Sequence, residues 1–441
     1  MRYNIETLGC KVNQYESAAL AALLAERGHT PLIPEASGDF TDCIIILNTC
    51  AVTGEASRKS RQAARRLLRE FPGAKLAVCG CASQLDADWA RGLGASLVGG
   101  SGDRRAFVSA LERLFHADAE VSQAPDDPRA RREFEPLPSG GVPGRTRAML
   151  KIQDGCDNFC AYCVIPYARG RARSLPLAAA EAEARGLAAR GYREIVVTGI
   201  EISSYGKDLP SPVPLTTLLR AVANAANEGA ADSRKMRIRL GSLEPSSVTP
   251  EFCGALAELP GLCGHFHLSL QSGCDATLRR MRRRYDTAAF RAALLTLRDA
   301  FPNLGASADL IVGFPGETDG EFAQTLAFLE ECALSALHVF PYSKRPGTPA
   351  AAMDHQIPNA VKRERVKAAR EVGARTRAAY LNAQVGRTLS VLFEREADGF
   401  SLGHAENYPE VAVPEPNLRG KVLPVYAERA ENDIIYGKLA L

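Results

Sequence analysis

The sequence predicts an α/β protein with three parts: an N-terminal doubly wound parallel α/β domain, a central partial (β/α)6 barrel of the TIM type, and a small C-terminal antiparallel β-barrel. Two series of apolar, β-branched runs alternate with helical patterns, which indicates parallel sheets. A stretch rich in Pro, Asp, Arg, Gly and Ser separates the two series, and short strands between Gly, Asn and Pro turns follow them. We therefore expect a first domain over residues 1–116, a linker over 117–147, a central domain over 148–378 and a last domain over 379–441.

In the first domain, strands are expected at residues 3–9, 43–47 and 76–78. The run at 43–47 is apolar and β-branched throughout, as in a strand that is buried on both faces. Helical patterns fill the intervals, including one from about Gly54 to Phe71. This alternation predicts a doubly wound parallel sheet.

Three cysteines of this domain share one topological position. Cys10, Cys50 and Cys81 each stand where a predicted strand ends and a helix begins. The carboxyl ends of parallel strands meet at one edge of a sheet, so we expect the three thiols to lie close together. They are one ligand short of the four that a 4Fe-4S cluster takes, and three buried structural cysteines are the alternative. Cys79 is the ambiguous neighbour of Cys81, and strand alternation directs it to the other face.

The central domain repeats the order of strand and helix. Its strands are expected at 148–153, 194–198, 236–240, 266–270, 307–312 and 336–341. Such units suit a curved parallel sheet resembling part of a TIM barrel, in which the chemistry lies at the carboxyl ends of the strands. The residues of interest at those ends are Gly199, Glu201, Glu244, Gln271 and Gly313. An ordinary loop or helix-cap role is the alternative for each.

The strongest motif is Cys156, Cys160 and Cys163, with the spacing CxxxCxxC directly after the first of these strands. Three thiolates can hold three irons of a 4Fe-4S cluster and leave the fourth iron open to a small molecule. A structural zinc site or three buried thiols are the alternatives, but zinc sites usually show CxxC pairs, and no His or further Cys lies near to complete one. With Tyr162 between the last two cysteines, the motif resembles that of the radical SAM enzymes.

This resemblance implies that the open iron binds the amino acid end of S-adenosylmethionine (SAM), which the reduced cluster splits to a 5′-deoxyadenosyl radical. SAM needs hydrogen-bond partners and a flat apolar slot. Gly199 and Gly313 allow close approach of the backbone, and Glu201, Glu244 and Gln271 are candidates to bond the ammonium or the ribose. We count Tyr162 with these candidate cofactor contacts.

Composition and charge indicate a globular, soluble chain. No signal peptide or membrane-spanning run is recognised, and the twelve cysteines of a long chain without export signals indicate reduced thiols in the cytoplasm. The net charge is only +3, but basic residues gather in three segments. A solvated helix face explains each segment equally well by itself, while three such segments on one chain point toward a polyanionic partner. These segments comprise Arg58, Lys59, Arg61, Arg65, Arg66 and Arg69; Arg279, Arg280, Arg282, Arg283 and Arg284; and the residues from Lys362 to Arg377.

The C-terminal part is expected to hold short strands at 388–393, 400–405, 408–413, 421–427 and 434–439. Five short strands in so short a segment suit a small antiparallel barrel, and OB-like barrels often bind single-stranded or looped RNA. A dimerisation or lid module is the alternative.

As a whole, the chain resembles the radical SAM methylthiotransferases, and its last part is similar to their TRAM module, an RNA-binding unit. The resemblance lies in residues 7–17 (TLGCKVNQYES), 48–50 (NTC), 80–84 (GCASQ) and 151–156 (KIQDGC). The start LGCKVN is similar to the branch that modifies threonylcarbamoyladenosine beside the tRNA anticodon. Members acting on isopentenyladenosine usually show Gln-Met-Asn after the first cysteine.

The resemblance implies a reaction with two 4Fe-4S clusters. The cluster of Cys156, Cys160 and Cys163 would supply the radical, and the cluster of Cys10, Cys50 and Cys81 would hold the sulfur that becomes a methylthio group at C2 of the adenine. It implies the anticodon stem-loop of a tRNA as partner, and an electron donor such as flavodoxin or ferredoxin. The alternatives are a methylthiotransferase acting on isopentenyladenosine or on a ribosomal protein side chain, and a non-catalytic iron–sulfur protein that binds RNA.

Overall fold

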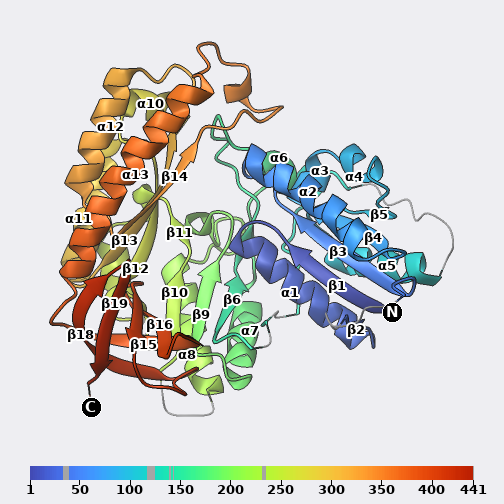
Figure 1. Cartoon of the computed structure of the whole chain (residues 1–441), viewed down its shortest axis with the longest axis horizontal. Helices are drawn as coiled ribbons and strands as arrows, with labels where there is room; N and C mark the ends of the chain where they lie inside the picture. The colour runs from blue at the N-terminus through green and yellow to red at the C-terminus, as the bar shows by residue number, and fades with distance from the viewer. Residues whose placement is uncertain (33–38, 117–124, 139–140, 143, 231–234, 441) are drawn as a thin grey trace.

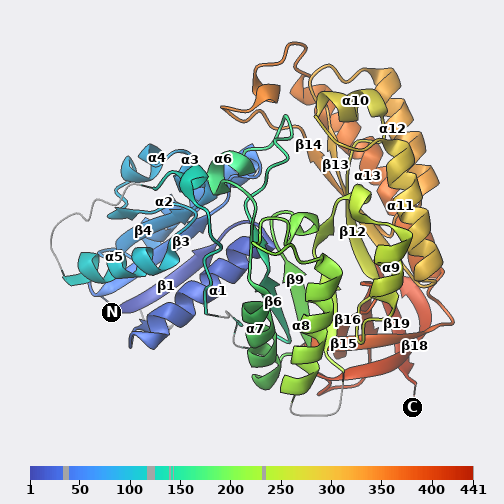
Figure 2. The ribbon, with the colours of Figure 1, turned by 180° about the vertical axis from the view of Figure 1, so that it is seen from behind.

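The computed structural model describes residues 1–32, 39–116, 125–138, 141–142, 144–230 and 235–440. The N-terminal domain lies beside the central domain, and the C-terminal barrel lies at one end of the central sheet (Figure 1). The view from behind shows the same three parts (Figure 2). Eleven residues of the expected linker at 117–147 lie outside the described residues, namely 117–124, 139–140 and 143. None of the described helices is both long enough and apolar enough to cross a membrane.

The N-terminal sheet is parallel, with the strand order β2-β1-β3-β4-β5. This is the flavodoxin-like doubly wound order, in which ligands bind outside the carboxyl ends of β1 and β3. The expected strands are confirmed, while β2 and β5 are pairs of residues too short to give a sequence pattern. The bounds are β1 Arg2–Thr7, β2 Thr30–Pro31, β3 Cys43–Thr49, β4 Lys75–Gly80 and β5 Leu97–Val98.

Helices cover both faces of this sheet. The buried strand β3 directs Ile44 and Ile46 toward α1 and α5, and Ile45 and Leu47 toward α2. Alternation along one strand therefore supplies two apolar cores, as a doubly wound sheet requires. The helices are α1 Lys11–Glu26, α2 Gly54–Glu70, α3 Cys81–Leu85, α4 Asp88–Arg91 and α5 Arg104–His116.

The central domain is a curved parallel sheet in chain order. Strands β10 and β11 are one strand interrupted at Gly241, and its first half pairs with β9 whereas its second half pairs with β12. The predicted partial barrel is thereby confirmed. The strands of its wall are β6 Arg147–Lys151, β9 Glu194–Thr198, β10 Arg237–Leu240, β11 Ser242–Leu243, β12 His265–Gln271, β13 Gly305–Val312 and β14 Ala336–Pro341.

Helices pack on the outside of this curved sheet around one apolar core. The last helix, α13, runs without interruption past residue 378, where we expected the domain to end. A short antiparallel pair, β7 Gln153–Asp154 and β8 Arg173–Ser174, flanks the loop that carries the central cysteines. The helices are α6 Ile165–Arg169, α7 Leu177–Ala189, α8 Leu215–Gly229, α9 Pro250–Ala257, α10 Asp275–Arg280, α11 Thr287–Ala300, α12 Asp319–Cys332 and α13 Asn359–Asn382.

The C-terminal part is a closed barrel with the strand order β15-β16-β17-β19-β18. It is antiparallel, as expected, except that β17 pairs with β19 in parallel. The long strand β18 pairs with β15 through its first half and with β19 through its second half, so β19 returns beside β17 in the same direction. The strands are β15 Thr388–Ala397, β16 Phe400–Ala405, β17 Glu410–Val413, β18 Val422–Glu431 and β19 Ile434–Leu439.

The barrel is joined to the amino end of the central sheet by polar contacts. The buried Arg239 pairs with Glu194 and also donates to the carbonyl oxygens of Ala405 and Glu406, at 3.3 and 3.0 Å. The ring of Tyr408 stacks on His265, with 4.4 Å between ring centroids. The C-terminal barrel therefore closes the end of the central sheet opposite to the cysteine loop.

Candidate functional site

The N-terminal cysteine site consists of Cys10, Cys50 and Cys81, at the carboxyl ends of the neighbouring strands β1, β3 and β4. Each thiol interacts electrostatically with the other two. Gly9, at φ +115°, allows the approach, because a Cβ on it would lie 2.6 Å from the Cβ of Cys50. The structure thus brings together three thiols that are far apart in sequence.

Burial distinguishes these thiols from one another. Cys10 is exposed, whereas Cys50 and Cys81 are buried, and burial raises the pKa of Cys50 and raises that of Cys81 to about 12. Such thiols ionise when a metal supplies the compensating charge. Cys79 lies in the apolar core between the sheet and helices α1 and α5, away from this site.

The central cysteine site consists of Cys156, Cys160 and Cys163 in the loop between β7 and α6. The three thiols interact electrostatically with one another, and burial raises the pKa of Cys156 and raises that of Cys163 to about 12. Ala161 fixes the loop, because its N–H donates to the carbonyl of Met281 and its own carbonyl accepts from the N–H of Ala350, at 2.9 and 2.8 Å. All twelve cysteines lie in the described residues, and all are free thiols.

Both sites fit a 4Fe-4S cluster by their chemistry. Each offers three thiols without a disulfide and without a fourth Cys among the described residues that interacts with the set. Three thiolate ligands leave one iron of a cubane open. Each site also places one arginine against one cysteine, which supplies a hydrogen bond of the kind that tunes such clusters.

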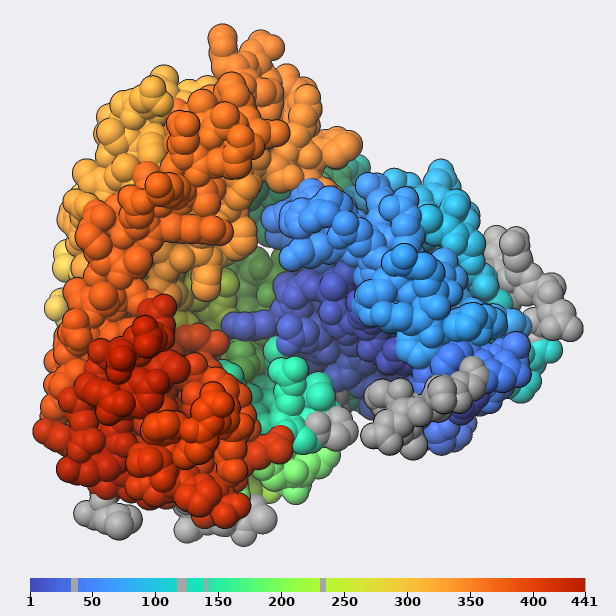
Figure 3. All heavy atoms as spheres, viewed as in Figure 1, coloured from blue at the N-terminus to red at the C-terminus, as the bar shows by residue number. Residues whose placement is uncertain are grey.

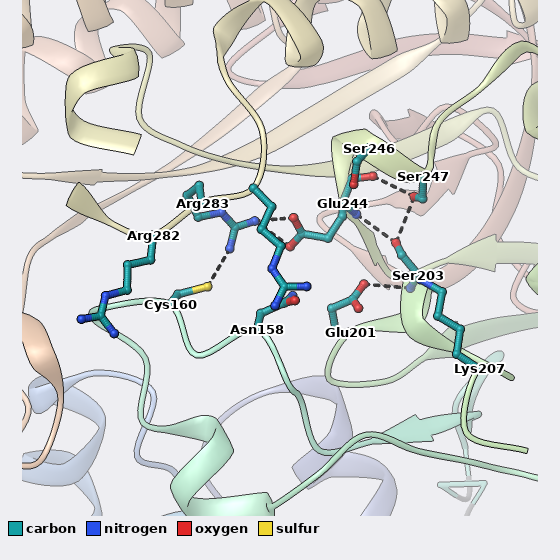
Figure 4. A pocket seen from close by; sticks show the side chains of 11 residues that line it. Asn158, Cys160, Glu201, Ser203, Lys207, Glu244, Ser246, Ser247, Arg282 and Arg283 are labelled. Atoms are coloured by element: carbon teal, nitrogen blue, oxygen red, sulfur yellow. Dashed lines mark hydrogen bonds and ion pairs between the residues drawn. The ribbon is translucent and has the colours of Figure 1, made fainter. Parts of the chain in front are cut away.

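A polar cavity of about 160 Å³ adjoins the central site (Figure 4). Cys160 lies on its wall with Glu201 and Glu244, two of the expected cofactor contacts. The cavity is lined by Asn158, Cys160, Glu201, Ser203, Lys207, Glu244, Ser246, Ser247, Arg282, Arg283 and Arg284. Carboxylates and hydroxyls opposite a cysteine could bond the ammonium and ribose of a nucleoside ligand.

The other expected contacts are not among the residues that line this cavity. Gly199 packs on Gln153, and a Cβ on Gly313 would lie 2.4 Å from the Cγ of Lys362. Gln271 stands at the end of β12 with a left-handed φ of 64°. Tyr162, within the cysteine loop, packs against the apolar cluster that contains Phe314, and its hydroxyl accepts from Arg283 at 3.5 Å.

Arg283 is a site residue that the sequence did not single out. The basic segment that contains it predicts a contact with a polyanion, but the Arg283 side chain turns inward. Its guanidinium donates to the Sγ of Cys160 at 3.0 Å and to Glu244 at 2.6 Å (Figure 4). Burial would lower the pKa of this arginine, but the surrounding anionic groups raise it, so its charge is permanent.

Arg169 occupies the corresponding position at the N-terminal cysteine site. It ends helix α6 of the central domain, is fully buried, and donates from Nε to the Sγ of Cys81 at 3.2 Å. Its other nitrogens donate to Glu16 at 2.7 Å, to Asp154 at 3.1 Å and to Asn13 at 3.0 Å. One side chain therefore links the N-terminal cysteines to strand β7, which directly precedes Cys156.

Glu16 is the centre of a buried ion network around this arginine. Lys151 lies 2.8 Å from both Glu16 and Asp154, and Arg104 lies 2.8 Å from Glu16. Burial alone would raise the pKa of Glu16, but Arg169, Lys151 and Arg104 hold it well below its usual value. The network fixes helix α1 against the central domain in one orientation.

Comparison with known proteins gives the class of the chain. Residues 150–329 match the Radical SAM superfamily, and residues 2–93 match a family described as Uncharacterized protein family UPF0004. The fold resembles that of the radical SAM methyltransferase TsrM from Kitasatospora setae, with a TM-score of 0.58 at 15% identity over 79% of this chain and 77% of that chain. Residues 150–329 thus form a radical SAM domain, and the likeness to TsrM shows a shared fold.

Curated relatives narrow this class. The threonylcarbamoyladenosine tRNA methylthiotransferase MtaB of Bacillus subtilis is 36% identical over 95% of this chain and 92% of its own. MtaB of Thermotoga maritima is 36% identical over 88% and 86%, and the tRNA-2-methylthio-N(6)-dimethylallyladenosine synthase of Novosphingobium aromaticivorans is 35% identical over 99% and 97%. The chain belongs to the MtaB-like radical SAM methylthiotransferase family.

Proposed function

We propose that the chain is a tRNA methylthiotransferase that adds a methylthio group to C2 of threonylcarbamoyladenosine next to the anticodon, using two 4Fe-4S clusters and SAM. The observation that carries this proposal is the pair of three-thiol sites, held in one orientation by a shared arginine and a buried ion network. The names of two relatives at 36% identity support threonylcarbamoyladenosine as the base that is modified.

The protein contributes binding, orientation and a dry environment. When bound, the clusters and SAM supply a radical able to activate a C2–H that is neither acidic nor electrophilic, and the sulfur and methyl group to be transferred. Cys156, Cys160 and Cys163 would hold one cluster, and Glu201 and Glu244 would bond the polar groups of SAM in the adjoining cavity. Cys10, Cys50 and Cys81 would hold the other cluster, with Arg169 donating to one of its thiolates.

The proposed partners are the anticodon stem-loop of a tRNA and a reductant such as flavodoxin or ferredoxin, in the cytoplasm, where thiols stay reduced. The structure reduces the number of basic residues available to RNA. Lys362 and Arg365 are buried, Arg58 pairs with Glu55, and Arg66 pairs with Glu6 and Glu70. The cations that remain exposed include Lys59, Arg65, Arg69, Arg282, Arg284, Arg363, Lys367 and Arg370.

Iron content tests the two-cluster arrangement. After anaerobic reconstitution we expect about eight irons per chain, and about four in each of two triple alanine variants, one lacking Cys10, Cys50 and Cys81 and the other lacking Cys156, Cys160 and Cys163. If the first variant loses no iron, the N-terminal site is structural and methylthiolation is excluded.

The substrate is tested by mass spectrometry of nucleosides after incubation of the reconstituted enzyme with SAM, a reductant and tRNA. Methylthiolated threonylcarbamoyladenosine is the expected product. Methylthiolation of isopentenyladenosine or of a ribosomal protein instead would contradict the proposed base. Bound iron without any cleavage of SAM would contradict catalysis altogether.

A further inference from the structure

A hollow lies between the N-terminal domain and the other two parts of the molecule (Figure 3). Strands β12, β13 and β14 present a row of polar side chains on one face: His267, Asp309 and His338. His267 is held in place, because its Nε2 lies 3.3 Å from a carboxylate oxygen of Asp309 and its Nδ1 lies 3.0 Å from the Oγ of Ser307. These three residues are half-buried or exposed, so they remain accessible to a ligand.

Lys11 extends from the N-terminal domain toward this polar row. It directly follows Cys10 at the start of α1 and is exposed. Its charge nevertheless acts on the imidazoles of His265 and His338, and on Tyr408 of the C-terminal barrel. Its ammonium group therefore lies where all three parts of the chain meet.

The ammonium group of Lys11 forms no hydrogen bond or ion pair with any residue that the structure describes. The two arginines that interact with its charge already have carboxylate partners: Arg239 pairs with Glu194, and Arg147 pairs with Glu394 at 2.7 Å. The Lys11 ammonium thus lies at the wall of the hollow without a paired carboxylate, and a bound anion would supply one. The hollow offers an unpaired positive charge beside hydrogen-bonding imidazoles.

We propose that Lys11 binds a carboxylate on the N6 substituent of the target adenosine, with His338 and the His267–Asp309 pair bonding the polar atoms of the same substituent. This inference rests on the proposed function and assigns the residues that select the base. A threonylcarbamoyl group carries a carboxylate, a hydroxyl and a ureido group, which complement an ammonium, imidazoles and a carboxylate. A bound isopentenyl group would leave these polar groups desolvated and without hydrogen-bond partners. The site should therefore bind isopentenyladenosine much more weakly than threonylcarbamoyladenosine.

Binding of three anticodon stem-loops to the reconstituted enzyme tests the proposal. They carry threonylcarbamoyladenosine, its carboxylate methyl ester, or adenosine. We expect the wild type to bind the acid at least about tenfold more tightly than the ester, as a hydrogen bond between charged groups contributes. Lys11→Gln should bind acid and ester equally, and Lys11→Arg should restore part of the preference.

Lys59→Gln, a change of an exposed lysine on α2, is the matched control. It removes a positive charge from α2, outside the polar row, so it should weaken the binding of all three RNAs to the same extent and leave the ratio of acid to ester affinity unchanged. Because Lys11 adjoins Cys10, the iron content of each Lys11 variant is measured as well, and about eight irons per chain is expected.

The outcomes separate the two proposals. A wild type that fails to modify threonylcarbamoyladenosine in tRNA overturns the proposed function. A wild type that modifies it, while Lys11→Gln keeps the full preference for acid over ester, overturns only the role of Lys11. One equivalent of a divalent metal that is lost on His267→Ala also overturns it, since His267, Asp309 and His338 would then be metal ligands.

Discussion

At the scale of single residues, Arg169 connects the central domain to the N-terminal domain. It is a central-domain side chain whose partners include Cys81, Asn13 and Glu16 of the N-terminal domain. Its position could not be predicted from the sequence, because nothing in a lone arginine at the end of a short helix signals contacts with residues 88 to 156 positions earlier. The buried charges it compensates make its removal costly.

We expect Arg169→Met to lower the free energy of unfolding by about 3 kcal/mol or more, because Glu16 and Asp154 lose a buried partner. Arg171→Met is the control, since Arg171 is exposed in the same segment, and its change should stay within about 0.5 kcal/mol. Denaturation of the apoprotein measures both. If Arg169→Met and Arg171→Met lower the free energy of unfolding equally, the ion network around Arg169 contributes no net stability.

Arg283 offers a second test at this scale, through the central cluster. Arg283→Met removes the donor to Cys160 and leaves Glu244 without its partner. Loss of a hydrogen bond to a cluster sulfur should lower the reduction potential, which redox titration followed by electron paramagnetic resonance would detect. Arg279→Met, at an exposed position of the same basic segment, should leave the potential unchanged. An unchanged potential in Arg283→Met would refute the role of this donor.

Lowering the pH should reduce the stability that the Glu16 ion network contributes. The pKa of Glu16 is lower in the folded chain than its ordinary 4.5, so its contribution to stability is present above that value and is lost as the pH falls through the folded-state pKa. We expect the difference in unfolding free energy between the wild type and Glu16→Gln to stay constant from about pH 8 to about pH 6 and to shrink below about pH 4.5. A difference that grows on acidification would contradict this assignment.

At the scale of helices and strands, the sequence predicted the features that depend on hydrophobic periodicity and on the order of strands and helices along the chain. The buried run at 43–47 and the regular spacing of later strands gave the parallel sheets, and the rule for strand ends grouped Cys10, Cys50 and Cys81. Two-residue strands such as β2 and β5 leave no periodic signal. The parallel pairing of β17 with β19 depends on how the long strand β18 divides between two neighbours, which no local pattern encodes.

The turn between β1 and α1 gives a prediction at this scale. Gly9→Ala would place a Cβ 2.6 Å from that of Cys50 and require a left-handed φ, so the ends of β1 and β3 must separate. We expect about four irons per chain instead of about eight, with the central cluster retained. Gly28→Ala is the control, because Gly28 also has a positive φ but has no atom near its added Cβ. It should keep about eight irons.

At the scale of the whole molecule, the C-terminal barrel is part of the enzyme core. Its backbone carbonyls accept hydrogen bonds from the buried Arg239, and its Tyr408 stacks on His265 of the central sheet. The strand pattern indicated a separate small barrel, but side-chain contacts between distant segments have no sequence signature. The packing therefore argues against a freely detachable module.

A chain ending at residue 386 should consequently melt at least about 5 °C lower than the whole protein, because the amino end of the central sheet loses its hydrogen-bond acceptors. Arg395→Gln is the control, since Arg395 is exposed and pairs only within the barrel, and its midpoint should move by less than about 2 °C. Melting of the shortened chain at the original temperature would show that the barrel folds and acts independently.

The adjacency of Cys10 and Lys11 has a geometrical consequence for the transfer step. Successive Cα atoms of a trans peptide are separated by about 3.8 Å whatever the domains do. Under the two proposals above, the thiol that holds the N-terminal cluster and the lysine that binds the substrate therefore belong to neighbouring residues of one rigid turn. A small shift of the N-terminal domain would carry both together, and would change their distance from the central cysteines more than their distance from each other.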